Sequence, residues 1–74
     1  MDWIKEMKIK TYRVTIFNKK KKIDSYIISG ESKKSIYNTL KEFYYRTKKI
    51  KSKKDFDCHL VRVEFDGNNY IEVK

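Results

Sequence analysis

The residues best suited to metal or acid–base chemistry lie where the chain enters its last third. Asp55, Asp57 and His59 alternate, so on one continuous strand their side chains would project from the same face. Two carboxylates and an imidazole could hold a divalent cation, as in some metal-dependent nucleases. The simpler interpretation is that both carboxylates are solvated partners of Lys53 and Lys54, while His59 tops a buried stripe. We therefore predict no metal site.

A nucleophilic site is not indicated either. Cys58 and His59 are neighbours, and neighbouring strand residues point to opposite faces, so the two cannot form a nucleophile–base pair. A lone cysteine allows neither an intramolecular disulfide nor a four-ligand zinc site, which favours the cytoplasm, or a host cytoplasm if the chain is viral. Gly30 and Gly67 are the only glycines, too few for a phosphate-binding loop. We expect a protein that is not an enzyme, with no catalytic residue and no cofactor.

Basic charge is the firmest signal, and it is unevenly distributed. The chain has 19 Lys and Arg against 10 Asp and Glu, a formal net charge of +9. Residues 1–54 hold seventeen basic and five acidic side chains, whereas residues 55–74 hold two and five. Sixteen lysines, nine isoleucines and no alanine are typical of A/T-rich coding, which accounts for part of the lysine excess.

Two dense clusters supply most of this charge, and tyrosines lie near the second. Phosphate backbones attract such clusters through counterion release, and tyrosine rings can stack on bases. Because only three arginines are present, we expect nucleic-acid binding to be independent of sequence. The alternative is a solvated lysine-rich face. The residues predicted to contact nucleic acid or an acidic partner are Lys19, Lys20, Lys21, Lys22, Lys41, Tyr44, Tyr45, Arg46, Lys48, Lys49, Lys51, Lys53 and Lys54.

The elements that must position these residues begin with a hairpin over residues 11–29. Apolar residues alternate along residues 11–17 and 23–29, as half-buried strands require. The register that keeps the apolar sets together predicts a five-residue lysine loop at 18–22. It pairs Tyr12 with Ile28, Val14 with Tyr26, and Ile16 with Asp24.

A helix is predicted over residues 32–50. Ser32 is a plausible N-cap, and the apolar stripe that follows runs through Ile36, Leu40, Phe43, Thr47 and Ile50. A second hairpin is predicted over residues 58–74, turning at Asp66-Gly67. Its first strand is expected to bury the face that holds His59, Val61, Val63 and Phe65.

The order of elements predicts one α+β domain over residues 1–74, with an N-terminal segment at 1–10 and ββαββ order. A four-stranded sheet would carry the helix on one face, in either a β-grasp-like or a fully antiparallel arrangement. The predicted core is Tyr12, Val14, Ile16, Tyr26, Ile28, Ile36, Leu40, Phe43, Val61, Val63, Phe65, Ile71 and Val73.

The sheet face away from the helix is predicted to be too apolar for an idle surface. It suits a protein interface, a homodimer contact, or a cover formed by Trp3, Ile4 and Met7. The residues predicted for a protein interface are Phe17, Ile23, Ile27, Leu60, Arg62 and Tyr70.

These patterns favour a small binding protein. No apolar run approaches the roughly 18 residues of a membrane-spanning helix, so no membrane partner is expected. The first hypothesis is nucleic-acid binding through the lysine-rich loop and helix end. The alternative is a protein-binding inhibitor or adaptor, of the kind that phages and mobile elements encode, which docks on an enzyme that handles nucleic acid.

Overall fold

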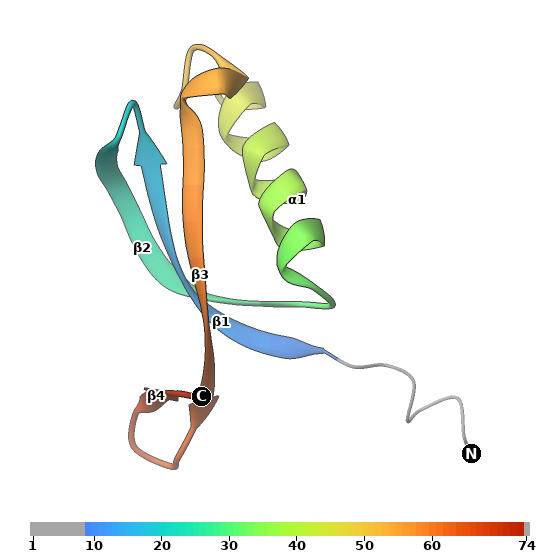
Figure 1. Ribbon diagram of the computed structural model, residues 1–74, viewed down its shortest axis with the longest axis vertical. Coiled ribbons are helices and arrows are strands. Elements are labelled where there is room, and N and C mark those ends of the chain that lie inside the picture. Colours follow the sequence, from blue (N-terminus) through green and yellow to red (C-terminus); the bar gives the residue numbers. More distant parts are fainter. Residues whose placement is uncertain (1–8, 74) are drawn as a thin grey trace, which may run out of the picture.

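Four antiparallel strands form one sheet, and a single helix packs on one of its faces (Figure 1). The computed structural model describes residues 9–73. Its elements are β1 (Lys10–Asn18), β2 (Lys21–Gly30), α1 (Lys33–Arg46), the 3-10 turn η2 (Lys53–Asp55), β3 (Phe56–Phe65) and β4 (Tyr70–Glu72). The strand order is β2-β1-β3-β4. Because β3 pairs antiparallel with β1, the fully antiparallel alternative is confirmed and the β-grasp-like one is wrong.

The β1–β2 register follows the alternation of apolar side chains. Val14 pairs with Tyr26 and Ile16 pairs with Asp24, as predicted. The connection, however, is a two-residue turn at Lys19-Lys20 instead of a five-residue loop. The prediction was wrong because a register shift after Ile16 inserts one extra residue in β2, which lets the strands pair up to the turn.

The helix begins and ends through identifiable caps. Ser32 accepts a 3.1 Å hydrogen bond from the Ser35 N–H, as an N-cap does. The helix ends at Arg46, four residues earlier than predicted, because Lys48 adopts a positive φ of 61°. The N–H groups of Lys48 and Lys49 turn back to donate to the carbonyls of the last helical turn, which is a Schellman motif.

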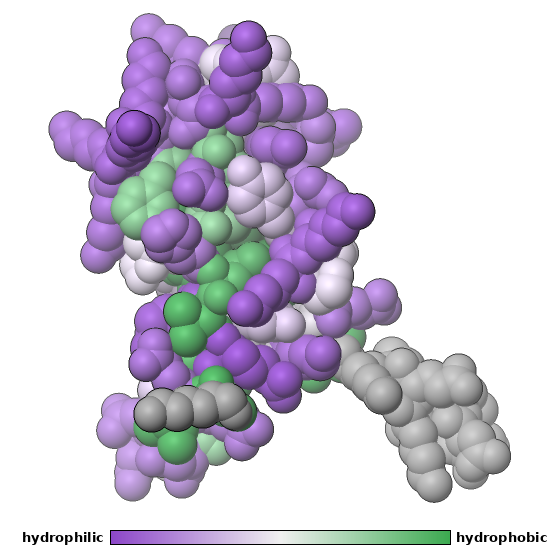
Figure 2. All heavy atoms as spheres, in the orientation of Figure 1, coloured by the Kyte–Doolittle hydropathy of each residue, from purple (hydrophilic) through white to green (hydrophobic). Residues whose placement is uncertain are grey.

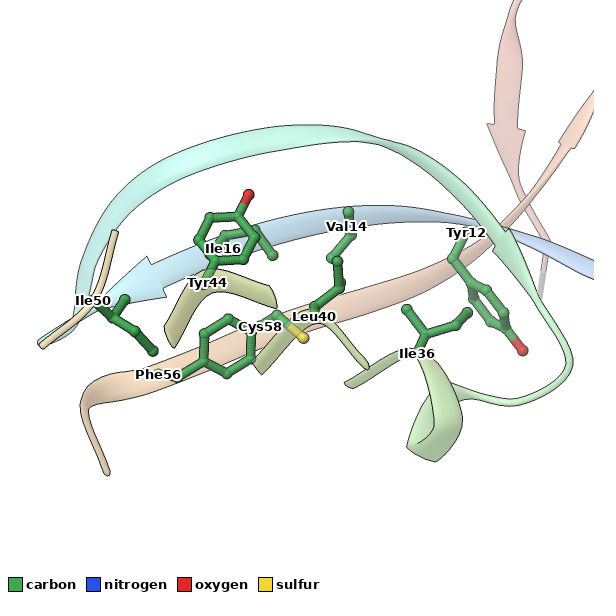
Figure 3. Close-up of a cluster of buried hydrophobic side chains, with 9 residues drawn as sticks. All are labelled: Tyr12, Val14, Ile16, Ile36, Leu40, Tyr44, Ile50, Phe56 and Cys58. Carbon is green, nitrogen blue, oxygen red and sulfur yellow. The ribbon is translucent and has the colours of Figure 1, made fainter. Parts of the chain in front are cut away.

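The core lies between α1 and the sheet face that it covers (Figure 3). Leu60 and Tyr37 are partly buried against it. Burying these side chains together removes the apolar stripe of each element from water. The buried members of this cluster are Tyr12, Val14, Ile16, Ile36, Leu40, Tyr44, Ile50, Phe56 and Cys58.

The predicted inner face of β3 was wrong. Cys58 pairs with Ile16 and Leu60 pairs with Val14, so these residues share the face that α1 covers. Val61 is 37% exposed and Phe65 is 59% exposed. Since β3 has apolar residues on both of its faces, alternation alone could not choose between them.

Four further positions differ from the predicted core. Phe43 is half exposed, whereas its neighbour Tyr44 is only 2% exposed and takes its place beneath the helix. Tyr26 on β2 and Ile71 on β4 are exposed, because both strands lie at edges of the sheet. Ile50 is buried although it follows the end of the helix.

The one helix of residues 9–73, α1, is 14 residues long and polar on its outer side. It is neither long nor apolar enough to cross a membrane. The predicted cover of the sheet by Trp3, Ile4 and Met7 falls outside the described residues.

Candidate nucleic-acid interface

The two lysine clusters meet at one end of the molecule. The chain runs along β1, back along β2, forward through α1 and back along β3, so the β1–β2 turn and the α1–β3 connection lie together, at the top of Figure 1. A 3.0 Å hydrogen bond from the Lys19 N–H to the Asp55 carbonyl joins them. We call residues 19–22 and 46–54 the basic end. It holds ten Lys and Arg side chains and no acidic one.

Lysines from both clusters line shared hollows of this surface. Lys19 from the turn lies with Lys48, Lys49 and Lys51 around one hollow. A neighbouring hollow is lined by Lys19 and Lys20 together with Lys54. Figure 2 shows the same end covered by hydrophilic atoms. A phosphate entering either hollow would therefore meet ammonium groups from two separate parts of the sequence.

Three of these lysines occupy a backbone conformation that favours glycine or asparagine. Lys19 and Lys20 have φ values of 53° and 66°, and Lys48 has a φ of 61°. The left-handed region costs an ordinary L-residue about 1 kcal/mol or more. Non-glycine residues that retain this cost concentrate at functional sites.

An aromatic ring borders the basic end on the helix side. Tyr45 is 44% exposed and lines a hollow of about 550 Å³ with Arg46, Lys48, Ile50 and Lys51. The Lys53 Nζ lies 5.1 Å from the centroid of the Tyr45 ring. A flat ring among cationic side chains is the combination that binds single-stranded nucleic acid.

Acidic residues also lie on and beside this surface. Lys53 forms an ion pair with Glu42, and this contact lowers the pKa of the Glu42 carboxyl. The bond from Lys19 uses only the backbone carbonyl of Asp55 and does not involve its carboxylate. Asp55 lines both hollows and Asp57 lines the second, so the ten basic side chains outnumber the acidic residues of this surface but do not exclude them.

Two of the predicted contact residues lie elsewhere. Tyr44 is buried, and its hydroxyl donates to Asp24 while a second hydroxyl, that of Tyr26, lies 3.0 Å away. Its ring is therefore unavailable for stacking on a base. Lys41 lies over the ring of Tyr37, 5.3 Å from the centroid, on the body of the helix. The remaining predicted lysines and Arg46 belong to the two segments that form the basic end.

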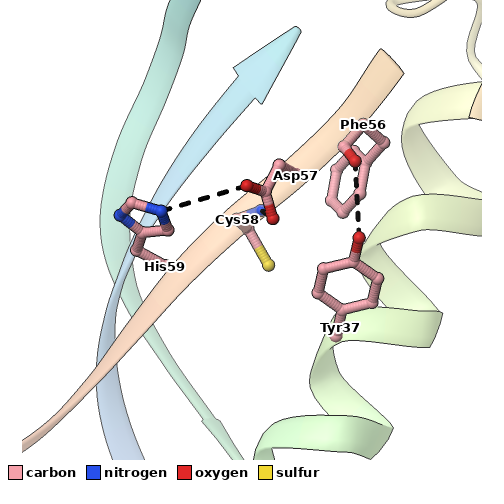
Figure 4. Close-up of polar contacts among 5 residues, drawn as sticks. All are labelled: Tyr37, Phe56, Asp57, Cys58 and His59. Carbon is pink, nitrogen blue, oxygen red and sulfur yellow. Dashed lines mark hydrogen bonds and ion pairs between the residues drawn. The ribbon is translucent and has the colours of Figure 1, made fainter. Parts of the chain in front are cut away.

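Of the predicted alternation of acids and histidine, only Asp57 and His59 come together (Figure 4). Asp55 belongs to the 3-10 turn, and His59 is exposed instead of buried. The Nε2 atom of His59 lies 3.9 Å from an Asp57 carboxylate oxygen, and both side chains are well exposed. Within residues 9–73 no group of three or more ligating side chains is placed to hold a metal ion.

Cys58 points to the other side of β3 (Figure 4) and is buried. Burial, aided by the Asp57 carboxylate, raises the pKa of the Cys58 thiol to about 11. The thiol is therefore protonated at neutral pH, the form that does not act as a nucleophile.

The outer face of the sheet differs in part from its prediction. Leu60 and Arg62 lie on the face that α1 covers, paired with Val14 and Tyr12. Their predicted place in a protein interface on the outer face was therefore wrong. The cause is that β3 turns toward the helix the face opposite to the predicted one. The side chains that take their place on or beside the outer face are Val61 and Phe65, whereas Val63 is only 1% exposed, which confirms its predicted burial.

Three predicted members of the patch keep their place on or beside the outer face. The Phe17 ring packs 4.9 Å from the His59 ring, and Tyr70 packs 5.1 Å from Phe65. Ile27 pairs with Arg13, whose guanidinium donates a 3.0 Å hydrogen bond to the Tyr70 carbonyl. The sixth, Ile23, is 38% exposed at the irregularity in β2.

Comparison of the chain with protein-family models, curated proteins and solved structures found no match.

Proposed function

We infer that this protein binds nucleic acid through its basic end, without reading the base sequence. The observation that carries the proposal is the convergence of the β1–β2 turn with the α1–β3 connection, held by the bond from Lys19 to Asp55. Two lysine segments that are separated along the chain thereby form one cationic surface. The setting we propose is the cytoplasm, or a host cytoplasm if the chain is viral.

The chemistry of this surface suits a phosphate backbone. Each ammonium group that neutralises a phosphate releases a condensed counterion, so affinity falls steeply with salt. Lysine lacks the flat two-pronged donor set with which arginine reads guanine. Of the ten basic side chains at this end, only Arg46 is an arginine. Contacts would therefore position the backbone without selecting a sequence.

Single strands are the favoured form. Tyr45 presents an exposed ring beside Lys48 and Lys51, so one base could stack while its flanking phosphates contact the ammonium groups. A duplex would use the ammonium groups alone, because its bases are already stacked.

The test is a binding titration with labelled single-stranded and duplex DNA and RNA of mixed sequence, followed by fluorescence anisotropy over a series of salt concentrations. The variant K49Q/K51Q removes two charges from the basic end. The matched control K33Q/K34Q removes two exposed charges from the first turn of α1.

We expect K49Q/K51Q to weaken binding of every sequence and to reduce the slope of log affinity against log salt by about 2. The control should change the slope by much less. Absence of binding at low salt, or equal losses in the two variants, would contradict the proposal.

The second candidate function is a protein-binding inhibitor or adaptor that docks on an enzyme handling nucleic acid. Exposed apolar side chains beside the outer face favour it, with Phe65 at 59%, Tyr70 at 39% and Val61 at 37%. A pull-down from host extract with nuclease treatment separates the candidates. A stoichiometric protein that survives the nuclease and is lost in V61D/Y70A supports this function, and capture that disappears with the nuclease supports the first.

A further inference from the structure

We propose that two copies of this chain associate through the free edge of β2, which would pair antiparallel with β2 of the second copy and join the two sheets. This proposal is independent of nucleic-acid binding. It rests on the length of the edge, on its lack of protection and on the symmetry of its sequence.

The outer edge of β2 is long and unpaired among the described residues. β2 spans ten residues, and within residues 9–73 it pairs with β1 alone, as the left-hand strand of Figure 1. Alternate residues of such a strand direct N–H and C=O groups outward, which makes the edge a template for another strand. Ser25, Tyr26 and Ser29 along this stretch are exposed.

The features that usually protect an edge are confined to the start of β2. Lys21, Lys22 and the irregularity at Ile23 guard the end nearest the turn. The stretch from Asp24 to Gly30 contains no lysine, proline or further irregularity. Its single charge, the Asp24 carboxylate, accepts a hydrogen bond from Tyr44 and so is held toward the helix.

The opposite edge of the sheet, formed by β4 and the start of β3, offers less backbone for pairing. β4 has only three residues, which offers little to a partner strand. β4 covers only the end of β3. At the start of β3, the Tyr37 hydroxyl of α1 donates a 3.3 Å hydrogen bond to the Phe56 carbonyl. Of the two edges, β2 is therefore the one available for pairing over its length.

The sequence of β2 is complementary to itself about Ile27. An antiparallel pairing centred there sets Ile27 opposite its own copy and Tyr26 opposite Ile28. It also sets Ser25 opposite Ser29. Each pair therefore joins two apolar or two hydroxyl-bearing side chains on the same face of the sheet. Both helices then lie on the same side of the joined sheet, because directly opposed strand residues share a face.

The neighbouring registers that also keep both helices on one side give less complementary side-chain pairs. Centring on Tyr26 would set Asp24 opposite Ile28, which joins a carboxylate to an apolar side chain. Centring on Ile28 would set Ile27 opposite Ser29 on the outer face. Alternation thus selects the register about Ile27.

This register separates the two basic ends. Lys21 and Lys22 fall outside the paired stretch, beyond which the second copy continues into Glu31, Lys33 and Lys34. Because the two strands are antiparallel, the two basic ends point away from each other. Two copies with a formal charge of +9 each would thus keep their densest positive charge apart.

The test uses the pair that this register brings together. S25K/S29K sets lysine against lysine at both symmetric positions, whereas S25K/S29E sets lysine against glutamate. Ser25 and Ser29 are exposed, and both variants lose the same hydrogen bond between the Ser29 and Thr11 hydroxyls. Mass is measured by light scattering and sedimentation over a dilution series, after nuclease treatment and at low salt, where the introduced charges are not screened. Circular dichroism checks the fold.

We expect the natural chain to form a dimer that dissociates on dilution. S25K/S29K should raise the dissociation constant by about tenfold or more, since like charges directly opposed on two symmetric pairs oppose association. S25K/S29E should dimerise as well as the natural chain. A natural chain that is monomeric throughout, or a dimer equally affected by both variants, would overturn the proposal. So would a dimer unaffected by S25K/S29K, which would place the contact on another surface.

Discussion

The Tyr44 hydroxyl donates a 2.7 Å hydrogen bond to the Asp24 carboxylate, which ties the last turns of α1 to the edge strand β2. Tyr44 is only 2% exposed, and Asp24 is partly buried. A buried hydroxyl bonded to a carboxylate contributes more than a neutral hydrogen bond does. The same bond holds the helix end, and hence the α1–β3 connection, beside the sheet.

We predict that Y44F lowers the free energy of unfolding by about 1.5–3 kcal/mol, because the Asp24 carboxylate loses a charge-assisted partner while the ring remains buried. Urea denaturation would measure this. Y45F, which removes a hydroxyl from the exposed neighbour, is the matched control and should change stability little. Equal effects of the two variants would show that the bond to Asp24 adds nothing.

Stability should fall at alkaline pH. The pKa of the Cys58 thiol is raised from 9.0 to about 11 in the folded protein, so the unfolded chain loses this proton first. The contribution of Cys58 is therefore fully present below about pH 9 and is lost between about pH 9 and 11, at up to about 1.4 kcal/mol per pH unit. Burial and the hydroxyl of Tyr26 also raise the pKa of Tyr44, which adds a second loss above about pH 10.

Urea denaturation of the natural chain and of C58A across this pH range separates the two contributions. C58A should show a shallower decline between about pH 9 and 11, with the remaining decline starting near pH 10. If the two chains decline in parallel, the thiol does not titrate differently on unfolding.

Replacing Lys48 with glycine should stabilise the fold and weaken nucleic-acid binding. K48G relieves a left-handed residue at the helix end, so we expect unfolding to cost about 1 kcal/mol more. Thermal or urea denaturation measures the gain, and anisotropy measures the loss of affinity. K49G is the control, because Lys49 has no positive φ and should gain no stability. A gain in both variants would remove the conformational explanation.

Tyr45 should matter for single strands in particular. Y45A is expected to weaken binding of single-stranded DNA by about 1–3 kcal/mol, with a smaller effect on duplex DNA, because only unpaired bases can stack on the ring. Y45F keeps the ring and should bind nearly as the natural chain does. Anisotropy titrations at one salt concentration suffice. An equal loss on single strands and duplex would assign Tyr45 a structural role instead.

The alternation of apolar residues determined the β1–β2 pairing from sequence. Val14 opposite Tyr26 and Ile16 opposite Asp24 follow from keeping like side chains on one face, because a slip of one residue would reverse every side chain. The N-cap at Ser32 and the turn at Asp66 were likewise visible, because their hydrogen bonds involve residues close in the chain.

Tertiary structure decided which face of β3 is buried and which aromatic residue lies beneath α1. β3 is apolar on both alternations, so its face follows from pairing Cys58 with Ile16 across the sheet. Phe43 and Tyr44 are adjacent and both aromatic, and burial of Tyr44 depends on a carboxylate twenty positions away, that of Asp24.

The lysine runs and the excess of positive charge were evident from the sequence alone. That the runs form a single surface depended on β1 and α1 ending at the same end of the sheet, where the Lys19 N–H meets the Asp55 carbonyl. Three of those lysines adopt left-handed backbone, where lysine has no intrinsic preference. The β1–β2 turn is held by the bond from Lys19 to Asp55 across the fold, and the helix end is closed by the bonds of Lys48 and Lys49 to the last helical turn.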